Sequence, residues 1–409
     1  MKRFLIIFVL LISILGASVP YVTGKFVEGH LQQFENTVMN TDGLQLIGAP
    51  HQQIIGWNTS QSQSNIKITA LDGQLKLEQQ VDHGFLPFKP VELSSKFHPD
   101  AVLKNTFKNM LGNDLPIEAI TQIELNGKSN TIFHQTNGGL KGTLNVDPRG
   151  KVVSGTLQTP TLKSPYLAYP FELNEGNLKF NVQRQEERLN TQLEGELGTF
   201  AFLKQFEAHK ISLHSNVSNS NQMIHQFAWD IKSDQVMIMN KEWGKFKIVM
   251  EGKNFDLSAF AKLRELSKAP TFQQRLMLPL MLLQEAPAFL QKLPAFQIKT
   301  LTLETPEGNL ELVGHFEMTP PQNIETNSLN VLFKNIKATW NGKVSEKLLR
   351  QWLSASSNKN SDDVDNALKN IENKHRLVRK ENDFVMNLRI ENGEAFLNDQ
   401  PLTLKDLKF

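Results

Sequence analysis

The chain has 409 residues, of which 40% are hydrophobic, and its 44 Lys and Arg nearly balance its 42 Asp and Glu. We expect no nucleic-acid partner, because proteins that bind nucleic acid usually carry a concentrated basic excess. The absence of cysteine excludes disulfides, thiolate metal sites, cysteine nucleophiles and a cysteine-linked lipid anchor. It suits a bacterial periplasm in which the protein folds without oxidation.

Residues 4–22 form an uncharged apolar run that predicts a transmembrane signal-anchor. As a helix the run would be roughly 28 Å long, close to the thickness of the hydrocarbon core of a bilayer. Lys2 and Arg3 precede it, so the positive-inside rule places the N-terminus in the cytoplasm and the body in the periplasm, held by a single pass through the inner membrane. The alternative is a signal peptide cleaved near Gly16 and Ser18, which would release the protein into the periplasm.

A stalk helix is predicted directly after this anchor. Within residues 25–38 the apolar side chains recur at helical spacing, as Val27, Leu31, Phe34 and Val38. This continuation favours an uncleaved anchor. We therefore assign residues 1–24 to the cytoplasmic tip and the anchor. Residues 25–353 form a β-rich periplasmic body, in which two sub-domains would have their boundary near 255–295.

From Asn65 onward, apolar and polar residues alternate at period two. This pattern predicts an α+β fold that is predominantly antiparallel β, with short helices packed on the sheet. Turn signatures interrupt the alternation and predict β-hairpins. They lie at Asp72-Gly73, Asn126-Gly127, residues 147–150 and Glu175-Gly176-Asn177. A run of further strands is predicted from His209 to Met250.

Several helices are predicted between the strands of the sheet. One opens at His98-Pro99-Asp100 and another begins near Asp256 or Ser258. The first is expected to carry its apolar residues on one face, as Val102, Leu103, Phe107, Met110 and Leu111. The apolar stretch at 272–293 is interpreted as a buried helix or helix pair, and the alternative is a helix that faces lipid or a partner.

The C-terminal part of the chain begins with a polar stretch. Residues 354–365, SASSNKNSDDVD, predict a linker because they lack apolar periodicity. In residues 366–409 we expect a helix and a β-hairpin that complete the body.

No motif predicts a catalytic residue, a metal ligand or a cofactor-binding residue, and no cofactor is expected. Gly127-Lys128-Ser129 resembles the end of a P-loop. That motif needs glycine at the position of Gln122, however, so a hairpin turn is the better interpretation. Ser64 with Lys67, and Ser356 with Lys359, have the spacing of a Ser-Lys dyad, and we interpret both as chance.

The histidines are interpreted as structural. His209, His214 and His225 are the nearest approach to a cluster, but odd spacing on strands puts the first two on opposite faces, which disfavours a shared metal. His83-Gly84, within DHGFLPFKP, is interpreted as part of a rigid turn that packs aromatic residues.

Four segments in order span nearly the whole chain: Tyr21 to Lys25 after the hydrophobic N-terminus, the Asp82-His83-Gly84 loop, LTLETPEGNLELVG at 301–314, and ENGEAFLNDQPL at 391–402. Together they resemble the YdgA-like family of bacterial proteins of unknown function, although Asn398-Asp399 departs from the Asn-Gly turn associated with it. The resemblance implies an inner-membrane anchor with a periplasmic body in Gram-negative bacteria. It supplies no catalytic residues.

The sequence favours a non-enzymatic envelope protein that binds a lipid, another apolar ligand or a partner protein. Long alternating strands give a sheet an apolar face that something must cover. Two alternatives stay open. One is an envelope glycan hydrolase that uses a carboxylate pair, for which Glu304 and Glu307 are available. The other is a purely structural protein that forms a homo-oligomer through a sheet edge.

Overall fold

The computed structural model describes residues 44–46, 54–55, 59–68, 73–83, 91–111, 117–124, 126–135, 139–164, 171–203, 206–220, 223–239, 241–256, 292–319, 334–357, 361–373 and 376–402. The predicted anchor (4–22), the stalk helix (25–38), the helix expected beyond Asp256 and residues 272–291 of the apolar stretch lie outside these residues. No helix within them has the length and apolar character that crossing a membrane requires.

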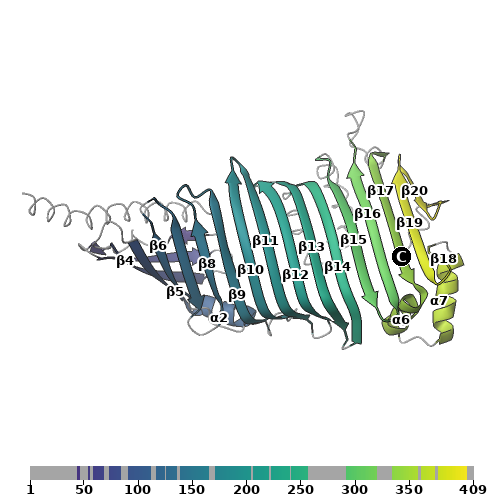
Figure 1. The fold of residues 1–409 in the computed structure, drawn as a ribbon, viewed down its shortest axis with the longest axis horizontal. Coiled ribbons are helices and arrows are strands. Elements are labelled where there is room, and N and C mark those ends of the chain that lie inside the picture. The colour runs from purple at the N-terminus through teal and green to yellow at the C-terminus, as the bar shows by residue number, and fades with distance from the viewer. Residues whose placement is uncertain are drawn as a thin grey trace, which may run out of the picture. The chain divides into compact units, whose positions relative to one another are not determined.

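Most of the described chain is antiparallel β-sheet, with a few short helices (Figure 1). It divides into two compact units, residues 1–183 with 197–204 and residues 184–196 with 205–409. The predicted boundary near 255–295 is therefore corrected. The strands on either side of it, β14 (Lys241–Asp256) and β15 (Ala295–Thr305), pair directly within the second unit.

In the first unit, each strand from β3 to β10 pairs antiparallel with the next, and β1 and β2 both pair with β3. Its elements are β1 (Leu44–Leu46), β2 (Ile54–Ile55), β3 (Thr59–Ile68), β4 (Gly73–Asp82), β5 (Val91–Pro99), α2 (Ala101–Leu111), β6 (Ile117–Ile123), β7 (Ser129–Gln135), β8 (Lys141–Val146), β9 (Val152–Ser164) and β10 (Phe171–Gln185). The β11 strand (Arg188–Phe202) contributes to both units.

The period-two alternation places one face of this sheet inside. On β4, Leu77 and Val81 are fully buried, whereas Lys76 and Glu78, on either side of Leu77 in the strand, form an ion pair on the other face. The predicted helix is confirmed as α2. Asp100 caps it, because its Oδ1 accepts a hydrogen bond from the backbone N–H of Leu103 over 2.7 Å.

For the apolar face that was predicted on helix α2, the structure describes the burial of Val102 and Leu103. Leu103 is buried, but Val102 is 48% exposed and does not belong to that face. A Cβ on Gly73 would overlap with the Leu103 side chain. This glycine therefore begins β4 and also leaves room for the helix.

The predicted hairpins around residues 68–73, 123–129 and 146–153 are confirmed by the register of β3–β4, β6–β7 and β8–β9. The turn predicted at Glu175-Gly176-Asn177 is wrong, because β10 continues through these residues. Glu175 has a φ of 55° and forms no ladder pair, while its neighbours pair with Thr161 and Thr159. The residue between these two is Pro160, which has no N–H to donate.

In the second unit, the strands from β12 to β17 form an antiparallel meander to which β19 adds, and β18 and β20 flank β19. Besides β14 and β15, its elements are β12 (Phe206–Ser220), β13 (Met223–Ile238), β16 (Gly308–Met318), β17 (Ile336–Ser345), α6 (Glu346–Ser357), α7 (Ser361–Asn373), β18 (Val378–Lys380), β19 (Asp383–Glu391), β20 (Glu394–Leu397) and β21 (Gln400–Pro401). The predicted C-terminal hairpin is confirmed as β19–β20, and residues 403–409 lie outside the described chain.

The linker predicted at 354–365 is largely helix. Residues 354–357 end α6 and residues 361–365 begin α7, so only 358–360 lie outside the described helices. The reason is that Val364 and Leu368, one helical turn apart, are both buried against Phe384 of β19. Asp362 and Asp363 in the first turn of α7 also suit the positive end of a helix dipole.

Candidate functional site

One face of the sheet in the second unit is apolar from β13 to β19. Residues that pair directly across an antiparallel ladder point to the same side of the sheet, so a row of partners can be followed from strand to strand. One row runs through Trp229, Met250, Ile298, Gly314, Trp340 and Leu388. The rows on either side are Ile231, Ile248, Leu301, Leu312, Gly342 and Met386, and Phe227, Gly252, Phe296, Phe316, Ala338 and Ile390.

Five aromatic side chains of these strands form a continuous series of ring contacts, which we call the aromatic face. They are Phe227, Trp229, Phe255, Phe296 and Trp340. The ring centroid of Phe227 lies 4.9 Å from that of Trp229, 5.4 Å from that of Phe255 and 6.3 Å from that of Phe296. Phe296 in turn lies 6.3 Å from Trp340. These separations are typical of favourable aromatic pairs.

Two of these rings pack flat against the sheet because glycines on the neighbouring strands leave room for them. A Cβ at Gly252 would overlap with the ring of Phe227, and a Cβ at Gly314 would overlap with the indole of Trp340. Each ring therefore covers the backbone of the strand beside it. The result is an apolar surface on which these two rings cover strands that carry no side chain at those positions.

The helix α6 closes one end of this apolar face (Figure 1). Leu348 is 3% exposed and belongs to a core cluster with Ala208, Val236 and Trp243. Ser345 begins the helix, because its Oγ accepts a hydrogen bond from the N–H of Leu348 over 3.3 Å. At the other end of the face, Trp229 remains 38% exposed.

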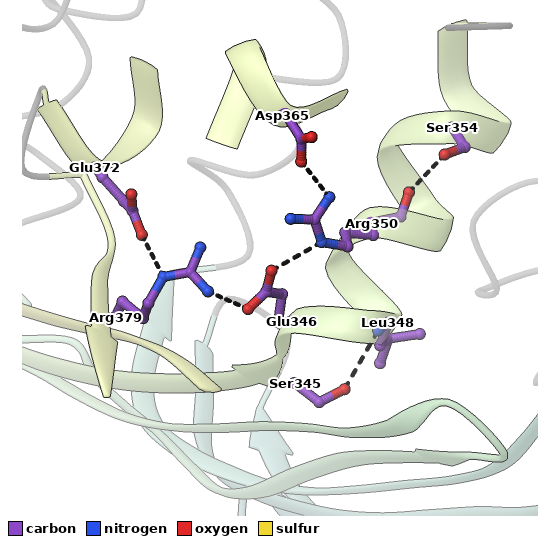
Figure 2. A network of polar contacts seen from close by, with 8 residues as sticks. All are labelled: Ser345, Glu346, Leu348, Arg350, Ser354, Asp365, Glu372 and Arg379. Atoms are coloured by element: carbon purple, nitrogen blue, oxygen red, sulfur yellow. Dashed lines mark hydrogen bonds and ion pairs between the residues drawn. The ribbon is translucent and has the colours of Figure 1, made fainter. Parts of the chain in front are cut away.

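Figure 2 shows the polar network that holds α6 in place. The Nε of Arg350 donates to Glu346 over 2.8 Å, and its Nη1 donates to Asp365 of α7 over 2.5 Å. Arg379 of β18 donates to Glu372 of α7 over 2.7 Å and to the second carboxylate oxygen of Glu346. The hydrogen bond from Arg350 is the main cause that lowers the pKa of Glu346 below its usual range, and Arg379 adds to it. The network thus connects α6, α7 and β18.

The opposite face of the same sheet is polar and carries close pairs of oppositely charged or polar side chains. Lys299 lies 2.6 Å from Glu251, and His315 lies 3.3 Å from Glu317. Exposed pairs of this kind contribute little stability. Their importance here is that they make the two faces of the sheet chemically distinct.

The residues considered for catalysis or metal binding are dispersed. Glu304 is exposed on β15, and Glu307 lies in the two-residue turn that follows. His209 and His214 lie on β12, where they pair with Gln235 and Asp230 of β13. Within the described ranges, no group of three or more His, Asp or Glu is placed to hold a metal ion.

The motif-like matches take structural positions. Gly127, with a φ of 86°, lies in the β6–β7 turn, and Asn126 there accepts a hydrogen bond from the N–H of Lys128, so the hairpin interpretation is confirmed. Ser64 is buried on β3, three residues from Lys67 and therefore on the other face. Ser356 belongs to α6, whereas Lys359 lies outside the described residues.

The sequence reading missed a buried polar row in the first unit. His83 is 2% exposed and its Nε2 lies 2.8 Å from the Oγ of Ser60, while residues 84–90 of its loop lie outside the described chain. Ser62, Ser64 and Ser95 are also buried. The signal was the stretch SQSQS at 60–64, in which serine alternates with glutamine at strand period. The small hydroxyl side chains face inward there.

Comparison with known proteins gives one match. The model of a family described as "Bacterial protein of unknown function (DUF945)" matches residues 1–405. No curated protein and no solved structure matches the chain.

Proposed function

Because the chain belongs to DUF945, a family of bacterial proteins of unknown function, we propose its function from the aromatic face: this is a membrane-anchored, non-enzymatic envelope protein that binds the acyl chains of lipids there. The observation that carries the proposal is the unbroken series of ring contacts from Trp229 to Trp340. It lies on the apolar face that, among the helices in the described part of the chain, α6 covers at one end.

Burial of this surface is favourable in itself. Removing apolar surface from water gains about 25 cal/mol per Å², and a Phe or Trp side chain buries roughly 150–250 Å². Because Trp229 is 38% exposed, the smaller part of that gain is still available to an occupant. An occupant that follows the row of rings would cover several such side chains at once.

The rings that lie over glycines on this face favour an acyl chain over a protein partner as the occupant. Protein partners usually anchor large side chains in pockets at the centre of an interface. Here the rings of Phe227 and Trp340 lie over Gly252 and Gly314, so the face offers apolar rings that lie flat on the sheet. A flexible acyl chain can bind along such rings without inserting a side chain into a pocket.

The predicted anchor at residues 4–22 is part of the proposal and supports a lipid as the occupant. It would hold the body beside a bilayer, where lipids are the abundant apolar molecules. The narrower resemblance to the YdgA-like family implies the same inner-membrane, periplasmic placement. Cell fractionation of the full-length protein, with and without residues 1–24, tests it. Release of the protein from the membrane in both forms would refute the anchor.

A catalytic role receives less support. A glycoside hydrolase needs two carboxyl groups about 5 to 9.5 Å apart that flank the scissile bond in a cleft. Glu304 is exposed on a strand and Glu307 belongs to a tight turn. We therefore propose binding without a chemical step.

The test uses the full-length protein in detergent with a phospholipid that carries a diazirine near the end of one acyl chain. Irradiation links the lipid to residues that it contacts, and peptide mass spectrometry locates them. We expect labelling on β13, β14, β15 and β17. Trp229→Gln should lower this labelling several-fold without unfolding the protein, because Trp229 is partly exposed.

The matched control is Trp352→Gln, which removes the same side chain from a 57% exposed position on α6. It should leave the labelling of β13 to β17 unchanged. The proposal is wrong if the lipid labels the polar face around Val313 equally, or if Trp229→Gln has no effect. Labelling that disappears while the protein forms a dimer through this face would instead identify a second copy as the occupant.

A further inference from the structure

The polar face of the second unit is hollowed where β12, β13, β14 and β15 pair in succession. The hollow has a volume of about 580 Å³, which is within the range of sites for small organic ligands. The β11 residues that line it belong to the second unit as well. Its lining is rich in primary amides, namely Asn190, Gln192, Asn216, Gln226 and Gln297.

The strand register places this hollow on the opposite side of the sheet from the aromatic face. Two rows of ladder partners line it, and the partners within a row point to the same side. The row between them, Phe227, Gly252 and Phe296, points to the aromatic face and therefore contributes backbone to the hollow. The two lining rows are Asn216, Ala228, Glu251, Gln297 and His315, and Ser218, Gln226, Lys253 and Ala295.

Two alanines leave the space that forms the hollow. Ala228 lies in the ladder between Asn216 and Glu251, and Ala295 pairs with Lys253. Each alanine side chain ends at Cβ, whereas its ladder partners carry long polar side chains. A longer side chain at either position would fill the hollow from its floor.

The charges that line the hollow balance. The lining carries one carboxylate, Glu251, and one ammonium group, Lys253. Glu251 also lies 2.6 Å from Lys299, and His315 lies 3.3 Å from Glu317. An excess of one sign, which would attract an ion of the other sign, is not built into this lining. The hollow therefore suits an uncharged polar ligand.

A second hollow of about 350 Å³ continues the same face toward β17 and β19. His315 lines the first hollow and Val313 lines the second. These residues are two positions apart on β16, so their side chains leave the same face about 7 Å apart. Asn341 and Asn387 line the second hollow, where Asn387 Nδ2 donates to Asn341 Oδ1 over 2.6 Å. The two neighbouring hollows favour an elongated ligand.

We propose that the polar face of the second unit binds a neutral oligosaccharide. Part of the ligand would occupy the hollow above Ala228 and Ala295, and the rest would continue toward Asn341. A primary amide presents two N–H donors and a carbonyl acceptor, and a hydroxyl group can both donate and accept. The five amides of the first hollow therefore match a ligand that carries hydroxyl groups on most of its carbon atoms.

An extended peptide fits this face less well. Extended peptides typically bind a sheet by adding to a free edge through main-chain hydrogen bonds. Here β13, β14, β15 and β16 each have ladder partners on both sides, so their backbone groups are already paired. Recognition on this face must come from side chains, which favours the sugar.

The test measures saturation-transfer NMR on the full-length protein in a detergent without a sugar headgroup. The neutral probes are maltohexaose and N-acetylchitohexaose. The comparison ligands are hexagalacturonate, which is acidic, and tetra-alanine, which is a peptide. We expect transfer to the ring protons of at least one neutral probe and at least several-fold weaker transfer to both comparison ligands.

Ala228→Phe is the decisive variant, because its ring would fill the hollow from the floor, and it should abolish the transfer. Gln297→Ala keeps the hollow open and removes one amide, so it should weaken binding several-fold even if Ala228→Phe fails to fold. Ser212→Phe is the matched control. Ser212 points to the same side of β12 as Asn216 but lines neither hollow. This control should bind as the natural protein does.

Three results would overturn the proposal: no transfer to either neutral probe, equal transfer to hexagalacturonate or tetra-alanine, or undiminished binding in Gln297→Ala together with a folded Ala228→Phe. The proposal is independent of lipid binding on the aromatic face. Trp229→Gln should leave oligosaccharide binding intact, and Ala228→Phe should leave the lipid labelling of β13 to β17 intact. Failure of one proposal is therefore distinguishable from failure of the other.

Discussion

Gly314→Ala tests whether the aromatic face depends on rings that lie over glycines. Gly314 of β16 lies beneath the indole of Trp340 on β17, and three atoms of that ring stand where the alanine Cβ would be. The backbone beside Gly314 belongs to a paired strand, so the ring must move. Moving it removes the contact between Trp340 and Phe296 at 6.3 Å.

The size of the effect follows from three contributions. Overpacking a well-packed site costs typically about 1–3 kcal/mol. Loss of an aromatic pair costs about 0.5–1.5 kcal/mol. Replacing glycine by alanine within a strand returns about 0.5–1 kcal/mol. We therefore expect Gly314→Ala to lower the free energy of unfolding of the second unit by about 1–3 kcal/mol.

Gly342→Ala is the matched control on the same face. A Cβ there would meet Leu312 and Met386 at 3.6 Å, which is ordinary van der Waals contact. The overpacking cost is absent, so this variant should be as stable as the natural protein or more stable by up to about 1 kcal/mol. The two substitutions are chemically identical and lie on adjacent strands.

Urea unfolding followed by tryptophan emission measures the difference. Four of the five tryptophans, Trp229, Trp243, Trp340 and Trp352, belong to the second unit, so the signal reports mainly on that unit. With a denaturant slope of about 2 kcal/mol per molar urea, a difference of about 2 kcal/mol separates the two midpoints by about 1 M. Equal midpoints would refute the reasoning. So would a Gly314→Ala, Trp340→Leu double variant with strictly additive losses, because removal of the ring should relieve the overlap.

Three further predictions concern the cap of α2, the packing of Phe384 against α7 and the ion pairs of Glu346. Asp100→Ala should lower stability by about 0.5–2 kcal/mol, because it removes the cap of α2; amide exchange in α2 as slow as in the natural protein would contradict this. Phe384→Ala should cost about 3–5 kcal/mol, because Phe384 is fully buried beneath α7; a melting temperature within the error of the natural protein would contradict this. Because hydrogen bonding from Arg350 lowers the pKa of Glu346 from its ordinary 4.5, the stabilisation from Glu346 is fully present above pH 4.5 and is lost as the pH falls through the lowered value. Thermal unfolding of Glu346→Gln should therefore depend less on pH below 4.5, and an unchanged pH profile would contradict this.

Local signals predicted much of the fold. Asn126-Gly127 was predicted as a hairpin turn, and Gly127 has a φ of 86°. The hairpin predicted within residues 366–409 turns at Asn392-Gly393, where Gly393 has a φ of 80°. The turn predicted at Glu175 failed because the deciding residue is Pro160 on the partner strand. Pro160 is far from Glu175 in the sequence, so a turn prediction made from the residues around Glu175 cannot take it into account.

The prediction of a linker at 354–365 was wrong for a related reason. Its polar composition resembles a disordered segment, but two apolar residues one turn apart, Val364 and Leu368, suffice to bury α7 against Phe384. Arg350 then reaches Asp365 across 15 positions of sequence. Packing and ion pairs with residues outside this stretch of sequence therefore stabilise helix despite the polar local composition.

The sequence predicted that some sheet face would be apolar, and it predicted strands between His209 and Met250, where Phe227, Trp229 and Ile231 alternate with other residues. It could not predict that Phe296 and Trp340 join Phe227, because that depends on the register of strands about 70 and 110 residues further along the chain. A shift of one residue would turn either ring to the polar face. The bulge between Ile298 and Leu301 shows how easily such a register changes.

Rings over glycines occur in both units, so this device alone does not make a binding face. Phe133 lies beside Gly142 and Phe180 beside Gly155 in the first unit, as Trp340 does over Gly314 in the second. In each case the ring restores apolar cover to a strand that glycine would weaken.

Among the described residues, the rings of the second unit differ in forming a series of contacts across β13, β14, β15 and β17, whereas Phe171 and Phe200 of the first unit form a single pair. Trp229 belongs to that series, but it pairs with Met250 and not with a glycine. Stability and binding are therefore separable on this face. Gly314→Ala acts on the packing beneath a ring, whereas Trp229→Gln removes a partly exposed ring without overpacking a strand, and its larger effect should be on binding of the occupant.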